Sequence, residues 1–179
     1  MRKIFWSLFE IVETIVIAVA AVFLIRTFVA QPFLVSGSSM EPNFYDGDYL
    51  LIDELTYRLR QAERGEVIVF KYPGNPSSYY IKRVIGLPGE RVVIDGDKVM
   101  IFNGDQKLVL KEEYVLSNRR QSYFETTLKT EQYFVMGDNR DFSFDSRSWG
   151  ALKGSEIIGL VRFRLWPVNQ VMAFTAPAY

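Results

Sequence analysis

Two residues of this 179-residue chain form a candidate pair for nucleophilic catalysis: Ser39, in a short polar loop, and Lys82, in a strongly apolar stretch. The chain contains no histidine and no cysteine. A Ser-His-Asp triad, a thiol nucleophile and a disulfide framework are therefore excluded. A serine can still act as a nucleophile when a neutral lysine takes its proton, and this pair is the candidate for that chemistry.

The serine lies in the loop Val35-Ser36-Gly37-Ser38-Ser39-Met40-Glu41-Pro42, just before the first expected strand. A tight loop that contains glycine can expose a hydroxyl and direct backbone N–H groups towards a developing oxyanion. Ser-Gly-Ser runs are also common in ordinary solvated loops. The loop alone therefore leaves both readings open.

The lysine is flanked by Ile81 and Arg83 in a run that predicts a strand. Most strand lysines point to solvent, which is the simpler interpretation of Lys82. To act as a base near neutral pH, its pKa must fall from about 10.4 towards 7–8, a cost of about 4 kcal/mol. Burial against an apolar wall can supply that change, and a lysine buried in this way is a functional candidate.

A third polar cluster occupies residues 137–147 and is rich in aspartate, arginine and serine. Its alternating oxygen-bearing side chains have the spacing of the first ligands of a calcium loop: Asp141, Ser143 and Asp145. Ser146 stands where such a loop needs glycine, and Leu152 where it needs a bidentate glutamate. We therefore expect no metal ion here, and instead a loop braced by Asp–Arg pairs.

An apolar segment precedes these clusters and predicts a membrane anchor. Residues 4–29 are mostly apolar, and about 20 helical residues span the roughly 30 Å of a hydrocarbon core. Arg2 and Lys3 precede the segment, which by the positive-inside rule keeps the N-terminus in the cytoplasm. We expect a cytoplasmic N-terminus at 1–8, a transmembrane signal anchor at 9–29 and an extracytoplasmic domain at 30–179.

Two other readings of this segment compete with the anchor. A cleaved signal peptide needs a small residue three positions before the cut, but Thr27-Phe28-Val29-Ala30 places phenylalanine there. A buried helix of a soluble protein usually carries one apolar stripe, whereas apolar residues surround this helix. A retained anchor would hold Ser39 close to the outer membrane surface, because the roughly dozen linking residues reach at most about 35–40 Å.

The remainder of the chain predicts a mostly β fold, because short β-favouring runs alternate with turn residues. Expected strands include Tyr49–Ile52, Val67–Phe70, Tyr79–Ile85, Tyr133–Met136 and Ile157–Leu165. Asp95-Gly96-Asp97 predicts a hairpin between the runs 91–94 and 98–101, and Asn103-Gly104 a further turn. We expect a small inserted hairpin subdomain at about 90–131, and a short helix only around 55–63.

Together the three clusters resemble a known family, the type I signal peptidases, in its compact Gram-positive form. The motifs are Ser39-Met40-Glu41-Pro42, then Tyr80-Ile81-Lys82-Arg83-Val84-Ile85-Gly86-Leu87-Pro88-Gly89-Glu90, then residues 137–150 ending in Ser148-Trp149-Gly150. They occur in the family's order behind an anchor, so the resemblance covers nearly the whole chain. It implies a Ser–Lys peptidase domain.

The resemblance also implies roles for individual residues. Ser39 would be the nucleophile and Lys82 the general base, with Ser143 orienting the lysine amine. Supporting ion pairs would join the residues Asp145 to Arg147 and Asp138 to Arg83.

Two positions depart from the family's commoner pattern. Gly37 stands where some members carry a hydroxyl residue that helps to bind the oxyanion. In the oxyanion loop formed with Ser38, the backbone N–H of Ser39 would then be the main donor. Asn43-Phe44 replaces the commoner Thr-Leu after the proline.

By this resemblance the chain removes signal peptides from exported preproteins, cutting after small residues at −1 and −3. Its expected partners are those signal peptides and the lipid bilayer, with no cofactor, no metal and no nucleic acid. The balance of 21 basic and 21 acidic residues independently argues against nucleic-acid binding. Alternatives are a non-catalytic, membrane-anchored binding domain and a self-cleaving protease of the LexA type.

Overall fold

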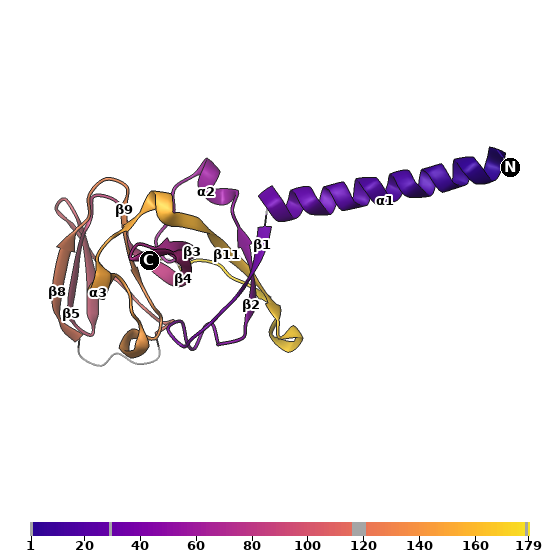
Figure 1. Ribbon diagram of the computed structural model, residues 1–179. Coiled ribbons are helices and arrows are strands. Elements are labelled where there is room, and N and C mark those ends of the chain that lie inside the picture. The colour runs from indigo at the N-terminus through magenta and orange to yellow at the C-terminus, as the bar shows by residue number, and fades with distance from the viewer. Residues whose placement is uncertain (1, 29, 116–120, 178) are drawn as a thin grey trace.

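The computed structural model describes residues 2–28, 30–115, 121–177 and 179, and within them the protein is mostly β, as predicted (Figure 1). The long helix α1 (Arg2–Phe28) projects from the β-rich part as a single rod. No helix within the described residues combines the length and the apolar character needed to cross a membrane.

Eight strands form the larger sheet. In the order β1-β2-β11-β3-β4-β9-β10, with β12 also paired to β11, it is antiparallel at every pairing. Its strands are β1 (Ala30–Leu34), β2 (Tyr49–Asp53), β3 (Val67–Tyr72), β4 (Asn75–Gly86), β9 (Gln132–Met136), β10 (Leu152–Lys153), β11 (Ile157–Trp166) and β12 (Met172–Ala173).

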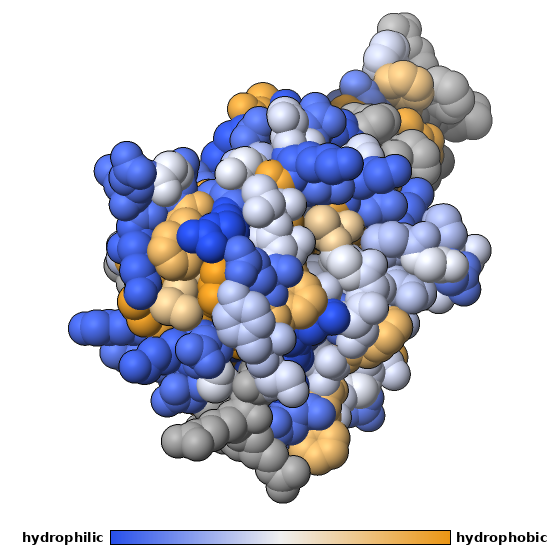
Figure 2. Space-filling view, turned by 90° about the vertical axis from the view of Figure 1, so that its left-hand side faces the viewer, coloured by the Kyte–Doolittle hydropathy of each residue, from blue (hydrophilic) through white to orange (hydrophobic). Residues whose placement is uncertain are grey.

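A second sheet of four strands has the order β7-β6-β5-β8 and lies at the end of the molecule away from α1 (Figure 1). Its strands are β5 (Arg91–Gly96), β6 (Lys98–Asn103), β7 (Gln106–Val109) and β8 (Gln121–Thr127). The pairing of Asp95 with Lys98 confirms the predicted hairpin turn. Figure 2 shows this end of the molecule: hydrophilic residues dominate it, and apolar residues form smaller, separate groups.

Short helices complete the fold: α2 (Thr56–Leu59), η1 (Arg140–Phe142), α3 (Ser146–Trp149), η2 (Gly154–Glu156) and η3 (Val168–Gln170). The helix expected around 55–63 is only the four residues of α2. Arg60 turns to an extended conformation with φ −148°, and its guanidinium pairs with Glu66 at 2.5 Å. That ion pair forms in the polar segment that the sequence pattern had assigned to a longer helix.

The core consists of three clusters of buried side chains, and β4 contributes to all of them. Ile85 belongs to the cluster shared with the smaller sheet, and Val84 to a second cluster under β3 and β9. Ile81 packs against the third, which includes residues of the loop after β1. Because β4 is fixed on several sides, the lysine that it carries has a defined position.

Candidate active site

Ser39 lies, half-buried, in the loop that joins β1 to β2. The loop turns at Gly37, whose φ of +95° lies in the left-handed region that suits glycine. The Gly37 N–H donates to Asp46 Oδ1 at 2.8 Å. On the other side, Asn139 donates from its backbone to Ser39 O at 3.0 Å and from its side chain to Ser38 O at 3.1 Å. The nucleophile loop is therefore held from two directions.

Lys82 lies on β4, 43 residues further along the chain, with its amine next to this serine. Its Nζ is 2.6 Å from Ser39 Oγ and donates to Ile81 O at 2.8 Å. Lys82 is only 4% exposed, so it does not have the solvent-facing orientation usual for strand lysines. The structure thus brings together the two candidate residues from separate elements.

The surroundings of Lys82 favour its neutral form. Burial lowers the pKa of Lys82 from 10.5 to about 8, and the positive charge of Arg147 acts in the same direction. The carboxylates of Asp145 and Asp138 oppose the shift without cancelling it. An amine with this pKa is neutral in an appreciable fraction of molecules between pH 7 and 8.

Two ion pairs lie around the dyad, and they join the partners that the resemblance pairs. Asp138 accepts from Arg83 Nε at 2.8 Å and Nη2 at 2.6 Å. Asp145 accepts from Arg147 Nε at 2.8 Å and Nη2 at 2.7 Å. Burial would raise the pKa of Asp145, but the hydrogen bond and charge of Arg147, together with the Gly137 N–H and the Ser143 hydroxyl, lower that pKa below its ordinary value.

Ser143 lies beside the dyad but is not hydrogen-bonded to the lysine. Its Oγ is buried and meets the geometric criteria for no hydrogen bond within the described residues, but the hydroxyl lies near enough to the Asp145 carboxyl to help lower its pKa. A Cβ added to Gly137 would collide with Ser143 Oγ and with the carbonyl oxygen of Ser39. Ser143 is thus next to the nucleophile, and its expected role in orienting the amine stays a prediction.

Comparison with known proteins identifies the family. The family model described as "Signal peptidase, peptidase S26" matches residues 8–166. The chain belongs to this family. It is 38% identical over 174 residues to a probable signal peptidase I-2 from Synechocystis sp., a match that covers 94% of this chain and 78% of that protein.

Other signal peptidases are also similar to this chain. Signal peptidase IB from Staphylococcus aureus is 30% identical over 179 residues, with 92% of each chain covered. A crystal structure of a signal peptidase I from Enterococcus faecalis has 29% sequence identity and a TM-score of 0.49, and the match covers 57% of this chain and 97% of that one.

In this member of the signal peptidase family, the dyad opens into a groove of about 610 Å³. Its walls come from the nucleophile loop, from β4 and from the segment around Ser143. They consist of residues 33–39, Leu50, Val69, residues 78–82, Phe142 and Phe144. The pairing of β4 with β9 begins only at Arg83, so the preceding residues of β4 are paired on one side, with β3. A free strand edge therefore runs along the groove.

The sequence did not single out several residues of this site. Asp46 and Asn139 hold the nucleophile loop, but only tertiary contacts reveal those roles. Phe142 and Phe144 line the groove while 73% and 52% exposed. Aromatic residues at two alternate positions of a polar loop were a sequence signal for an apolar contact surface.

Proposed function

We propose that this chain is a membrane-bound endopeptidase that removes N-terminal signal peptides from exported preproteins. Membership of the signal peptidase family supports the activity and the substrate class. The observation that carries the mechanism is the 2.6 Å separation between Lys82 Nζ and Ser39 Oγ at the floor of an open groove. The family match does not favour a non-catalytic binding domain or a LexA-type protease.

The first step uses the neutral form of the lysine. When the amine is neutral, the Ser39 hydroxyl donates its proton to Lys82 as Oγ attacks the scissile carbonyl. Lys82 then passes that proton to the leaving amine, and an ester joins the substrate to Ser39. Water, deprotonated by the same lysine, attacks the ester and releases the new carboxylate. Asp145 with Arg147, and Asp138 with Arg83, maintain the polar framework around these steps.

The oxyanion of the tetrahedral intermediate needs nearby donors. Gly37 offers no hydroxyl, and its backbone N–H already donates to Asp46. The Ser39 backbone N–H is therefore the proposed main donor, with the Gly37–Ser38 turn setting its direction. Ser143, whose buried hydroxyl lies beside the dyad, is the proposed residue that orients the lysine amine during the reaction.

The substrate is proposed to bind as an added strand. The free edge of β4 at residues 78–82 can pair with an extended peptide, and alternate side chains of that peptide would then face the groove. Val35, Leu50, Val69 and Ile81 contribute apolar side chains to the lining of this groove. We infer that shallow pockets in this apolar lining select small residues at −1 and −3.

We propose the location of the enzyme from the sequence of its N-terminal segment. The apolar run at residues 4–29, preceded by Arg2 and Lys3, supports a transmembrane anchor with a cytoplasmic N-terminus and an extracytoplasmic catalytic domain. The mainly hydrophilic end of the molecule opposite α1 suits a surface that faces water (Figures 1 and 2). The short connection from α1 to Ser39 would keep the dyad close to the membrane surface.

The direct test is cleavage of a model preprotein by the detergent-solubilised full chain, with the cut mapped by mass spectrometry. We expect one cut after a small residue, and complete loss of turnover in Ser39→Ala and Lys82→Met. Lys98→Met, which removes an exposed lysine from β6, is the matched control and should cut normally. Turnover retained by Lys82→Met would refute the dyad, and no cleavage by the wild type would favour a binding domain.

A further inference from the structure

Asn43, at a position where this chain departs from the family's commoner pattern, makes two side-chain hydrogen bonds. Its Nδ2 donates to Asp138 Oδ2 at 2.9 Å and to the backbone oxygen of Tyr114 at 2.8 Å. These partners lie 95 and 71 residues away in the sequence. One amide therefore joins the segment that carries Ser39 to two distant segments.

Asp138 links Asn43 to the strand that carries the base. It is 1% exposed, and its two carboxylate oxygens accept from Arg83 Nε and Nη2. Arg83 directly follows Lys82 on β4. A series of contacts that are not exposed to solvent therefore connects the two segments. Asn43 is hydrogen-bonded to Asp138, Asp138 is paired with Arg83, and Arg83 is next to Lys82 in the strand.

The residue after Asp138 holds the same loop at its other end. Asn139 donates to the carbonyl oxygens of Ser38 and Ser39, as described above. The dipeptide 138–139 thus contacts the nucleophile loop at two points, one on each side of the turn Met40–Pro42. Loss of the Asn43 contact would leave the loop attached at one of these points only.

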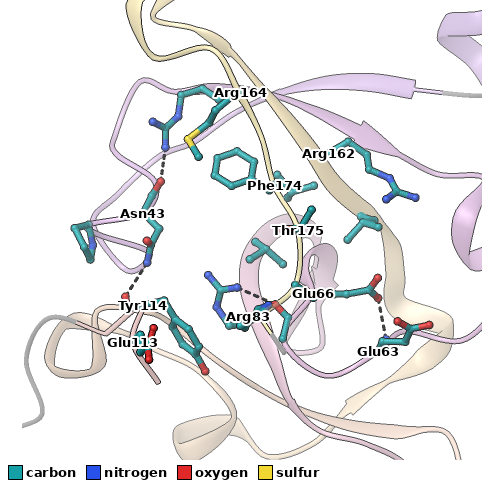
Figure 3. Close-up of a pocket in the computed structure, with 18 residues that line it drawn as sticks. Asn43, Glu63, Glu66, Arg83, Glu113, Tyr114, Arg162, Arg164, Phe174 and Thr175 are labelled. Atoms are coloured by element: carbon teal, nitrogen blue, oxygen red, sulfur yellow. Dashed lines mark hydrogen bonds between the residues drawn. The ribbon is translucent and has the colours of Figure 1, made fainter. Parts of the chain in front are cut away.

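Asn43 and Arg83 also line a second cavity, of about 590 Å³ (Figure 3). Figure 3 shows Asn43 between Arg164 and Tyr114, and Arg164 donates a hydrogen bond to the Asn43 carbonyl oxygen. Arg164 is itself paired with Asp48 at 2.9 Å. The Tyr114 ring lies 4.1 Å from the guanidinium carbon of Arg83. Asn43 is therefore fixed at both its backbone and its side chain.

We propose that Asn43 is a positioning residue for the peptidase reaction: acting through Asp138, it holds Ser39 within hydrogen-bond reach of Lys82. The proposal rests on the proposed function and adds a residue that the family pattern does not supply at this position. A small displacement of a nucleophile can cost about 100-fold in rate. Asn43 does not contact the groove that receives the substrate, so its loss should affect the chemical step and leave substrate binding intact.

The test compares the full chain with Asn43→Leu, which keeps the approximate size and removes both donors. We expect kcat for preprotein cleavage to fall about 10- to 100-fold while KM changes less than about twofold. Ile94→Val, a core truncation in the smaller sheet, is the control for lost stability and should retain wild-type kcat. Equal kcat in Asn43→Leu and this control would overturn the proposal.

A double-mutant cycle tests whether Asn43 acts through Asp138. In the Asp138→Ala background, which has no side-chain acceptor for Asn43 Nδ2, Asn43→Leu should lower kcat by less than about threefold, because the link is already broken. Effects that multiply fully would show that the two residues act independently and would contradict the proposed route. If the wild type itself cuts no preprotein, the proposed function fails first, which separates that failure from failure of the Asn43 proposal.

Discussion

At the scale of single residues, the proposed mechanism depends on the protonation of one buried amine, that of Lys82. The lowering of the pKa of Lys82 from 10.5 to about 8 corresponds to about 3 kcal/mol against the charged form. Burial supplies this change although two carboxylates, Asp145 and Asp138, favour the protonated amine. The apolar sequence around Lys82 indicated such burial, but the contribution of each charged neighbour required the structure.

The pH dependence of cleavage follows from this pKa. Lys82 must be neutral to take the serine proton, so kcat/KM should rise about tenfold per pH unit below pH 8 and level off above it. The midpoint should lie near pH 8, measured with a short peptide substrate over pH 6 to 10. A profile that is flat across pH 7 to 9 would show that no group with this pKa limits the reaction.

A substitution of Arg147, the cation near Lys82, should shift the midpoint of this pH profile in a known direction. Arg147 lowers the pKa of Lys82, so Arg147→Met should move the midpoint of the pH profile upwards. Lys98→Met removes a cation from β6, outside the groups that shift Lys82, and should leave the midpoint unchanged. A midpoint that moves downwards in Arg147→Met would contradict the electrostatic account of the site.

At the scale of elements, the segment after β9 packs closely against Ser39, the proposed nucleophile. Gly137 follows this strand directly, and its N–H donates to Asp145 Oδ2 at 3.0 Å. The backbone here passes so close to Ser39 and Ser143 that no side chain fits. The φ of Gly137 is not in the left-handed region, so backbone conformation does not require glycine here. Glycine is required because a Cβ would collide with the neighbouring atoms.

Gly137→Ala should therefore impair catalysis by moving the nucleophile. The added methyl group would displace the Ser39 carbonyl or the Ser143 hydroxyl, and we expect kcat/KM to fall at least about 100-fold. Gly104→Asn, in the turn between β6 and β7, is the control because asparagine tolerates the left-handed conformation and space is available there. Preprotein cleavage at the wild-type rate by Gly137→Ala would show that the loop can relax freely.

The elements also show how far sequence reasoning extends. Strands were predicted correctly from runs of β-branched residues such as Val67–Phe70, because these residues both favour the β conformation and are buried in the sheet. The strand β1 was not predicted, since Pro32 disrupts its pattern; it pairs with β2 alone, and proline is tolerated on such edge strands. The contact of Asn43 with Asp138 could not be predicted either, because it joins residues 95 positions apart.

At the scale of the whole molecule, the catalytic part and α1 are structurally separate. None of the three buried clusters contains a described residue of α1. The ion pairs and hydrogen bonds of the site likewise come from residues beyond β1. The β-rich part therefore has its own core, and we expect α1 to contribute little to its stability.

This separation leads to a prediction for a variant that lacks residues 1–29. Its thermal unfolding midpoint, measured by circular dichroism, should stay within about 3 °C of the full chain, and it should cut a short soluble peptide at a similar rate. It should no longer float with phospholipid vesicles, and cleavage of a vesicle-bound preprotein should fall because tethering raises effective concentration.

The matched control is the full chain with Ile15→Arg and Val19→Arg, which keeps the helix length but adds about 2.5–3.5 kcal/mol of insertion cost per charge. Flotation of the truncated variant, or of this control at the wild-type level, would show that membrane binding does not depend on α1.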